Sequence, residues 1–175
     1  MTARTAGRRP QRRPASRNAN RVPAGPAAPG RATSALVWAA LVLAVIGTGI
    51  SAYLVFERLQ GSSPVCIGTH GCATVQKSKY SAIFGVPVAT MGMALYLVLA
   101  AGAVAWLRDL RGQRPQLAAL AFYGTLFGLL FSGYLTYLEA FVIDAWCIWC
   151  ISSALVMTVL FATWLAVLAL TLRRR

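Results

Sequence analysis

Residues 147–172 read CIWCISSALVMTVLFATWLAVLALTL, and this run contains no charged side chain. About 20 apolar residues in a helix cross the hydrocarbon core of a bilayer, so the run predicts a transmembrane helix. Cys147 and Cys150 stand at its start, and positions i and i+3 share one face of a helix. The unpaired N–H groups of a helix start favour the thiolate, which is the reactive form of cysteine. The stretch therefore predicts a redox-active dithiol at a membrane surface.

Three further apolar runs come earlier in the chain, at residues 33–56, 88–107 and 116–138. Only 12% of the 175 residues are charged, against about 25% in soluble domains. We therefore expect an all-α integral membrane protein, folded as a bundle of four transmembrane helices. The first run is too long for a signal peptide and no cleavage site follows it, so we expect it to stay in the mature protein. Its residues Gly47, Gly49 and Ser51 offer a small face for close helix packing.

The stretch 57–87, between the first two runs, is polar and rich in turn-forming residues, and it holds Cys66 and Cys72. Residues 73–84 predict a short helix that lies on the membrane surface and ends before Gly85. The side chains that we expect to face lipid from this helix are Val75, Ile83 and Phe84.

The N-terminal stretch 1–32 is rich in Arg, Pro and Ala, and it contains 8 of the 17 basic residues and no acid. Such a composition cannot bury enough apolar surface to fold, so we expect a disordered basic tail. Binding to anionic lipid headgroups is an alternative role for it. Nucleic-acid binding is disfavoured because no folded module accompanies the charge. The membrane domain is then expected at 33–172, with a short basic end at 173–175.

The basic residues also predict an orientation, because loops on the cytoplasmic side carry an excess of Lys and Arg. The tail, the turn at 108–115 and the C-terminal end hold 14 of them, and the other two loops hold 3. Both ends of the chain are therefore expected in the cytoplasm. All four cysteines are then expected on the outer face, where an oxidising compartment favours two disulfides.

The Cys147/Cys150 pair has three possible chemistries: half of a zinc site, a structural disulfide or a redox dithiol. Zinc would need further ligands, for which Cys66, His70 and Cys72 are the candidates. A structural disulfide across so short a loop would remove little chain entropy. The redox interpretation is therefore favoured.

The Cys66/Cys72 pair lies in a loop with Gly68 and Gly71, which allow the chain to bend. A flexible loop can move its thiols between a soluble partner and Cys147, by thiolate attack on a disulfide. A simple structural staple of the loop is the alternative.

Five other residues border these pairs. His70 is either incidental or a base for thiol exchange. Glu139 and Asp144 are either solvated charges at a helix end or acids that assist a reaction consuming protons. Trp146 and Trp149 are typical interfacial anchors, although one of them could border a ring-shaped ligand.

A dithiol that accepts electrons repeatedly must pass them on, and the sequence contains no nucleotide, haem or iron–sulfur motif. Its place at the membrane edge suggests a lipid-soluble acceptor, for which a quinone is the natural candidate. An apolar pocket in the bundle with a few polar groups would suit the quinone ring. No metal is expected.

Three motifs together resemble the vitamin K epoxide reductase family. They are a C-x5-C pair in the first outer loop, the run SKYSAIFGVP at 78–87, and CIWC at the start of the fourth apolar run. The resemblance implies a four-helix bundle around a quinone, capped by the loop and its surface helix. It implies that Cys147 exchanges with a loop cysteine and that the loop pair accepts electrons from a thioredoxin-fold protein.

The resemblance also assigns individual residues. The catalytic cysteines would be Cys66, Cys72, Cys147 and Cys150, and the residues contacting the quinone would be Cys150, Ser78, Ser81 and Phe84. Ser81 stands where animal members carry an asparagine, and Ala154 stands where they carry a tyrosine. These differences disfavour epoxide chemistry and suit a bacterial reductase of menaquinone or ubiquinone.

The function expected from the resemblance is reoxidation of a DsbA-like protein at the bacterial inner membrane, which supports disulfide formation in exported proteins. Because the chain ends at Arg175, that partner is expected to be a separate protein. The DsbB family is the alternative enzyme class, but its C-x-x-C lies in the first outer loop and here it follows the third span. A non-catalytic membrane scaffold with two structural disulfides is the other alternative.

Overall fold

The computed structural model describes residues 30–66, 71–108 and 115–173. Four long helices dominate it: α1 (Arg31–Leu59), α3 (Val88–Arg108), α4 (Pro115–Leu138) and α5 (Ile148–Leu172). They confirm the four expected helices, with ends that differ by a few residues. The prediction of a disordered tail falls mainly on 1–29, and His70 falls within 67–70, so both lie outside the described residues.

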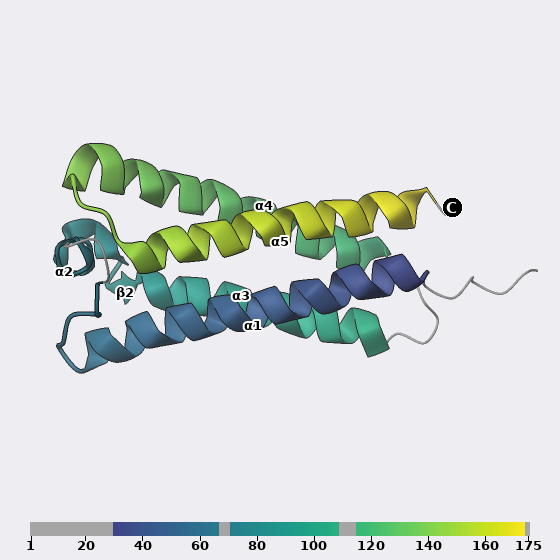
Figure 1. Ribbon diagram of the computed structural model, residues 1–175, viewed down its shortest axis with the longest axis horizontal. Coiled ribbons are helices and arrows are strands. Elements are labelled where there is room, and N and C mark those ends of the chain that lie inside the picture. The colour runs from purple at the N-terminus through teal and green to yellow at the C-terminus, as the bar shows by residue number, and fades with distance from the viewer. Residues whose placement is uncertain (1–29, 67–70, 109–114, 174–175) are drawn as a thin grey trace, which may run out of the picture.

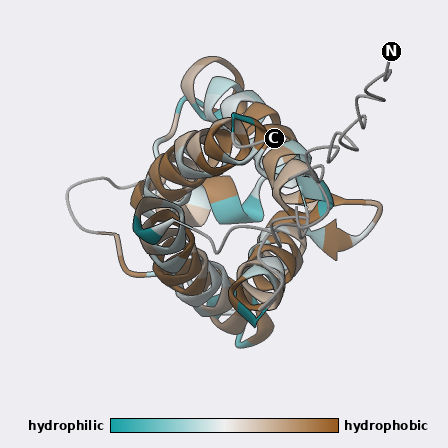
Figure 2. Cartoon of the chain, turned by 90° about the vertical axis from the view of Figure 1, so that its right-hand side faces the viewer, coloured by the Kyte–Doolittle hydropathy of each residue, from teal (hydrophilic) through white to brown (hydrophobic). Residues whose placement is uncertain are grey.

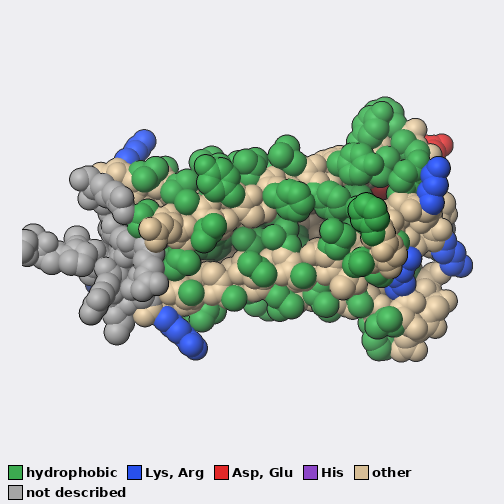
Figure 3. Space-filling model, turned by 180° about the vertical axis from the view of Figure 1, so that it is seen from behind, with side chains coloured by type: hydrophobic (Ala, Val, Ile, Leu, Met, Phe, Trp, Pro, Cys, Tyr) green, Lys and Arg blue, Asp and Glu red, His purple; other side chains and the backbone are tan. Residues whose placement is uncertain are grey.

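The four helices form a ring in which α1 lies beside α3 and α5, and α4 closes the ring between them (Figure 1). Each is long and apolar enough to cross a membrane. Large apolar side chains cover the sides of the bundle, and the Lys and Arg residues stand near its two ends (Figure 3). A soluble protein rarely exposes so much apolar surface, whereas a lipid-embedded one requires it. The chain is therefore a multi-pass membrane protein with an all-α bundle.

Helix α1 contacts its neighbours along one narrow stripe. The buried residues recur at alternating steps of four and three, which is a mean period of 3.5: Thr33, Val37, Ala40, Ala44, Gly47, Ser51 and Leu54. This period places them on one seam, as in left-handed bundles. Most of them are small, which lets neighbouring backbones approach closely in a membrane. Gly49, which we expected on the same face, lies off the seam, because a Cβ added to it would meet no atom within 4 Å.

The connection between α1 and α3 differs from the single surface helix that we predicted over 73–84. Helix α2 (Cys72–Lys77) is followed by a 3-10 turn, η1 (Lys79–Ser81), and by the hairpin strands β1 (Ala82–Ile83) and β2 (Val86–Pro87). The helix ends because Ser78 is extended and its Oγ donates to the Val75 carbonyl at 2.8 Å. Phe84 and Gly85 both have positive φ and form a two-residue turn, as short hairpins require.

The hairpin stands outside the ring of helices (Figure 2). Phe84 at its tip is fully exposed, as the prediction of a lipid-facing side chain requires. Val75 does not face lipid, because it lines the cavity inside the bundle. The short helix is therefore a cap on the end of the bundle as well as a surface element.

The stretch between α4 and α5 also differs from the simple connector that we expected at 139–146. The chain continues from α4 into one turn of π-helix, η2 (Glu139–Ile143), and Asp144 then takes a left-handed conformation with φ 51°. A π-turn shifts the side chains after it around the helix axis, and such turns are frequent at functional sites. The turn begins at Glu139, which is buried. It lies at the same end of the bundle as α2 (Figure 1).

Candidate active site

The dithiol lies at the start of α5, at the capped end of the bundle. Cys147 is the N-cap residue with an extended backbone, and Cys150 lies in the first turn. Both are free thiols, and Cys147 is fully buried. A hydrogen bond from the Cys150 thiol lowers the pKa of Cys147, because the thiolate accepts that bond. Cys147 is therefore the more readily ionised sulfur of the pair and the better nucleophile.

The loop cysteines Cys66 and Cys72 form a disulfide, with their Cα atoms 5.9 Å apart. Cys72 opens helix α2 and is fully buried. Its backbone N–H also donates to the Cys66 Sγ at 3.2 Å. Cys72 is thus enclosed at the capped end of the bundle, whereas Cys66 is partly exposed.

The two cysteine pairs meet through the backbones beside them. A Cβ added to Gly71 would stand 2.6 Å from the amide nitrogen of Trp146 and 2.7 Å from its carbonyl oxygen. Only glycine allows so close an approach. Because Gly71 precedes Cys72 and Trp146 precedes Cys147, this contact brings the neighbourhoods of those two buried cysteines together.

The residue before Cys66 is held from both sides by aromatic residues. The indole N–H of Trp149 donates to the Val65 carbonyl at 2.9 Å, and the Val65 N–H donates to the Tyr53 hydroxyl at 3.1 Å. The rings of Tyr53 and Trp149 lie 4.7 Å apart. Trp149 is therefore a structural link between α1, the loop and α5, beyond the anchor role that we expected. Trp146 is exposed, as an interfacial anchor would be.

A second link, which sequence reasoning missed, comes from Arg58 at the end of α1. Its guanidinium donates to the Gln76 carbonyl at 3.1 Å and to the Ser81 Oγ at 2.9 Å. These bonds tie α2 and η1 to α1 and hold the cap over the bundle. From the sequence alone, Arg58 contributed only to the count of basic residues, because its hydrogen-bond partners lie 18 and 23 residues away.

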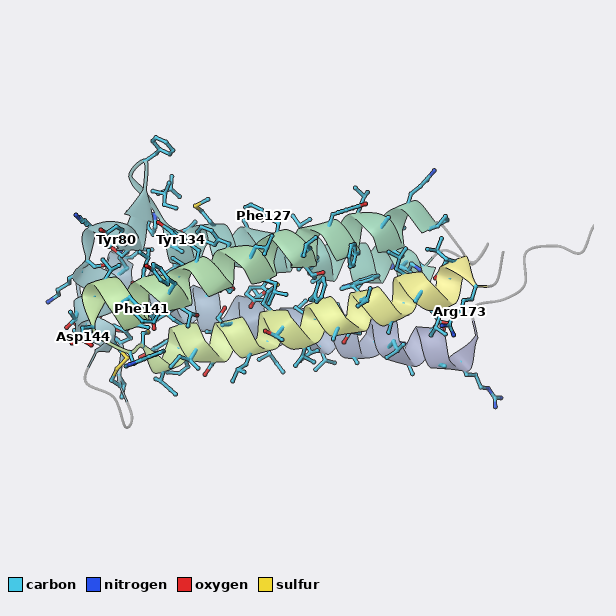
Figure 4. All side chains as sticks on the ribbon, turned by 90° about the horizontal axis from the view of Figure 1, so that it is seen from above. Tyr80, Phe127, Tyr134, Phe141, Asp144 and Arg173 are labelled. Carbon is cyan, nitrogen blue, oxygen red and sulfur yellow. A yellow bond between two sulfur atoms is a disulfide. The ribbon has the colours of Figure 1, made fainter. Side chains whose placement is uncertain are left out.

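A cavity lies under this cap and between the helices. Cys150, Ser78 and Ser81 line it, so the structure brings together three of the four residues predicted to contact the quinone. Phe84, the fourth, is not among its lining residues and stands exposed at the hairpin tip. Most of the wall is apolar, with contributions that include Leu54, Leu95, Phe131, Leu135 and Met157. Tyr80 also lines it, and Figure 4 shows this residue at the end of the bundle that carries the disulfide.

The polar side chains of the cavity differ in whether their hydrogen-bond donors are already used. Ser78 donates its hydroxyl hydrogen to Val75, and Ser81 donates to the Ser78 carbonyl at 2.8 Å. The Nε2 of Gln76 is buried and has no hydrogen-bond partner within the described part of the chain. A buried donor without a partner is costly. A ligand with a carbonyl oxygen would give Gln76 the acceptor it lacks.

Glu139 is the residue of this site that sequence reasoning did not place. Its side chain is only 3% exposed and forms part of the cavity wall. Its Oε2 accepts from the Cys147 N–H at 3.2 Å, and its carboxyl group is also a hydrogen-bonding neighbour of the Cys150 thiol. Asp144, weighed equally with it, is exposed. One signal in the sequence that could have pointed to Glu139 is that acidic residues are scarce, since the whole chain contains four.

The comparison with protein families agrees with this geometry. The model of the vitamin K epoxide reductase family matches residues 38–165, a range that includes all four cysteines, the cap and Glu139. The chain belongs to the vitamin K epoxide reductase family. No curated protein matches the sequence. As a member of the vitamin K epoxide reductase family, the chain is a membrane thiol oxidoreductase, which confirms the resemblance read from its motifs.

Metal ligation was another of the chemistries open to these cysteines. Within residues 30–66, 71–108 and 115–173, no group of three or more His, Cys, Asp or Glu side chains could hold a metal ion. His70, one of the candidate zinc ligands, lies outside these ranges.

Proposed function

We propose that this vitamin K epoxide reductase family member is a bacterial thiol oxidase that uses a membrane quinone. It reoxidises a DsbA-like thioredoxin-fold protein through Cys66/Cys72, passes the electrons to Cys147/Cys150, and delivers them to a quinone in the cavity. This activity supports disulfide formation in exported proteins. Both ends of the chain then lie in the cytoplasm of the cell, and the four cysteines lie outside the inner membrane.

The contact of Gly71 with the Trp146 backbone is the observation that carries this proposal. It supports Cys72 as the loop cysteine that exchanges with Cys147, since both are buried beside this contact. Cys66, which is partly exposed, is left to meet the soluble partner. On the far side of the dithiol, Cys150 lines the cavity. The cysteines thus form a series from the surface to the interior.

The exchange balances as two thiolate attacks. The Cys72 thiolate attacks the Cys147 sulfur of a Cys147–Cys150 disulfide, which forms a Cys72–Cys147 bond and releases the Cys150 thiol. The Cys66 thiolate then attacks the Cys72 sulfur, which closes the Cys66–Cys72 disulfide and releases Cys147. Two electrons and two protons have then moved inward. The structure has this final pairing, with the loop disulfide closed and two free thiols on α5.

The cavity residues fit a quinone as the next acceptor. A bound quinone supplies an acceptor for two electrons and two protons. The Gln76 amide would donate to one of its carbonyl oxygens, and the apolar walls would hold the ring. Ser78 and Ser81 would shape the cap, because their hydroxyl hydrogens are already donated within it. Replacing Gln76 by Leu should weaken quinone binding while leaving the four thiols intact.

The test uses purified full-length protein, a reduced DsbA-type protein, and short-chain analogues of menaquinone and ubiquinone. Wild-type protein should oxidise the partner and reduce at least one quinone. Cys150→Ala should abolish quinone reduction and keep the fold. Cys66→Ala should block oxidation of the partner, yet its chemically reduced Cys147/Cys150 pair should still reduce quinone. Ser63→Ala, on an exposed part of the same loop, is the matched control.

Two results would contradict the proposal. If wild-type protein neither oxidises the partner nor reduces either quinone analogue, the chain is not a catalyst of this reaction. If a membrane-impermeant maleimide fails to label Cys66 in whole spheroplasts of a Cys72→Ser strain, but labels it in inverted vesicles, the cysteines face the cytoplasm and the orientation is wrong.

A further inference from the structure

Glu139 occupies an environment that is unfavourable for a carboxylate. It is 3% exposed, and it belongs to a helical segment that continues an apolar span. Burying an ionised carboxylate is costly unless it is paired or hydrogen-bonded. Its side chain forms hydrogen bonds with the two reactive cysteines, through the Cys147 N–H and the Cys150 thiol. A carboxyl group placed in this way can exchange one proton with a sulfur without first exchanging it with water.

We propose that Glu139 is the base that accepts the Cys150 proton when the dithiol is oxidised. The proposal rests on the proposed function, since oxidation of this pair requires the quinone named there. It assigns to Glu139 a direct part in catalysis, because its carboxyl group touches a reacting atom. Glu139 stands one helical turn after Leu135, directly after the end of α4, and both residues line the cavity.

A bond forms between the sulfurs of Cys147 and Cys150, and the two S–H bonds break. Two electrons leave to the quinone, whose reduction to the quinol also consumes two protons. The proton of Cys150 passes to the Glu139 carboxylate, which lies on the cavity wall and keeps the proton until quinone reduction consumes it. The proton of Cys147, the sulfur with the lowered pKa, is lost separately to water.

A purely structural role for Glu139 makes a different prediction. Its Oε2 accepts from the N–H of the residue that caps α5, so the side chain could serve only to hold the helix start. Glu139→Gln separates the two roles. The amide oxygen of Gln can still accept from the Cys147 N–H, but an amide cannot take up a proton. Asp144→Asn is the matched control, because Asp144 is an exposed acid of the same connection and Asn also tolerates a positive φ.

The first measurement is a single turnover, in which chemically reduced protein is mixed with the quinone analogue and quinone absorbance is followed. Loss of a positioned base typically costs about 10²–10⁴-fold in rate. We expect Glu139→Gln to be slower than wild type by about a hundredfold or more, with unchanged quinone affinity and thermal stability. Asp144→Asn should react at the wild-type rate. If Glu139→Gln reacts as fast as wild type, the inference is wrong.

The second measurement does not use quinone. Infrared difference spectra are recorded between the chemically reduced and oxidised states of the dithiol. Oxidation in wild-type protein should produce a C=O stretching band of a protonated carboxyl group, and Glu139→Gln should lack this band while Asp144→Asn keeps it. A band that persists in Glu139→Gln overturns the inference. If wild-type protein fails to reduce quinone but shows the Glu139 band, the proposed acceptor is wrong and the proton-accepting role of Glu139 stands.

Discussion

The ring of Tyr96 on α3 packs against the backbone of Gly47 on α1. A Cβ on Gly47 would stand within 2.6 Å of the ring atom Cδ1, closer than any real side chain could. The Tyr96 hydroxyl also donates to the Ser153 carbonyl on α5 at 2.9 Å. Through this pair, three helices are joined at the wall of the cavity.

Replacement of Gly47 by Ala should therefore displace Tyr96 and loosen this wall. Overpacking of a filled site costs roughly 1–3 kcal/mol, and we expect the free energy of unfolding to fall by about that much. Gly49→Ala is the control on the same helix, because a Cβ there meets nothing within 4 Å. Thermal unfolding in detergent measures both variants. Equal stability of Gly47→Ala and Gly49→Ala would contradict the Tyr96 contact.

Gly71→Ala should slow the passage of electrons between the two cysteine pairs, because a Cβ there would collide with the Trp146 backbone. In a Cys66→Ala/Cys150→Ala background, only Cys72 and Cys147 remain, and mild oxidation should join them. A displacement of about 1 Å can cost on the order of a hundredfold in rate, so we expect Gly71→Ala to slow this bond formation by about tenfold or more.

The rate of that bond formation is read from peptide mass spectra of quenched samples. Thr74→Ala, which changes an exposed residue of α2, should have no effect. Should Cys72 and Cys147 fail to join in the background variant itself, Cys66 would be the exchanging cysteine.

The pH at which Cys147 becomes reactive should depend on the side chain at position 150. The Cys150 thiol lowers the pKa of Cys147 by donating to its thiolate. Cys150→Ala removes the donor, so the pKa of Cys147 should rise and its alkylation should begin at higher pH. Cys150→Ser keeps an O–H donor and should retain a lower midpoint. The measurement is the rate of iodoacetamide labelling against pH in a Cys66→Ser/Cys72→Ser background, and identical midpoints would refute the hydrogen bond.

Trp149→Phe should free the chain before Cys66. The substitution keeps a ring beside Tyr53 but removes the N–H that donates to Val65. A single hydrogen bond contributes roughly 0.5–1.5 kcal/mol, so amide hydrogen exchange in residues 61–66 should become about two- to tenfold faster. Trp146→Phe changes an exposed ring and serves as control. Equal exchange in the two variants would mean that the indole N–H does not hold Val65.

Much of this protein follows from local sequence. The four spans are set by runs of apolar residues, whose length needs only to match the thickness of a bilayer. The position of Cys147 and Cys150 follows from their spacing at the start of such a run. The motifs at 66–72, 78–87 and 147–150 led to the family that the family model then matched. All of these features depend on residues close together in the chain.

The tertiary structure alone decided which of these residues meet. Trp149 is hydrogen-bonded to a residue 84 positions away, and Gly71 before α2 packs on the backbone of Trp146 before α5. Glu139 continues the spacing of α4, since Ser132, Leu135 and Glu139 line one cavity at steps of three and four. An acidic residue does not contribute to an apolar pattern, so the sequence did not separate buried Glu139 from exposed Asp144. Apolar patterns fix which face of a helix is buried. They do not determine which helices become neighbours. Only the packing of the helices encloses the cavity whose wall includes Glu139 and Cys150.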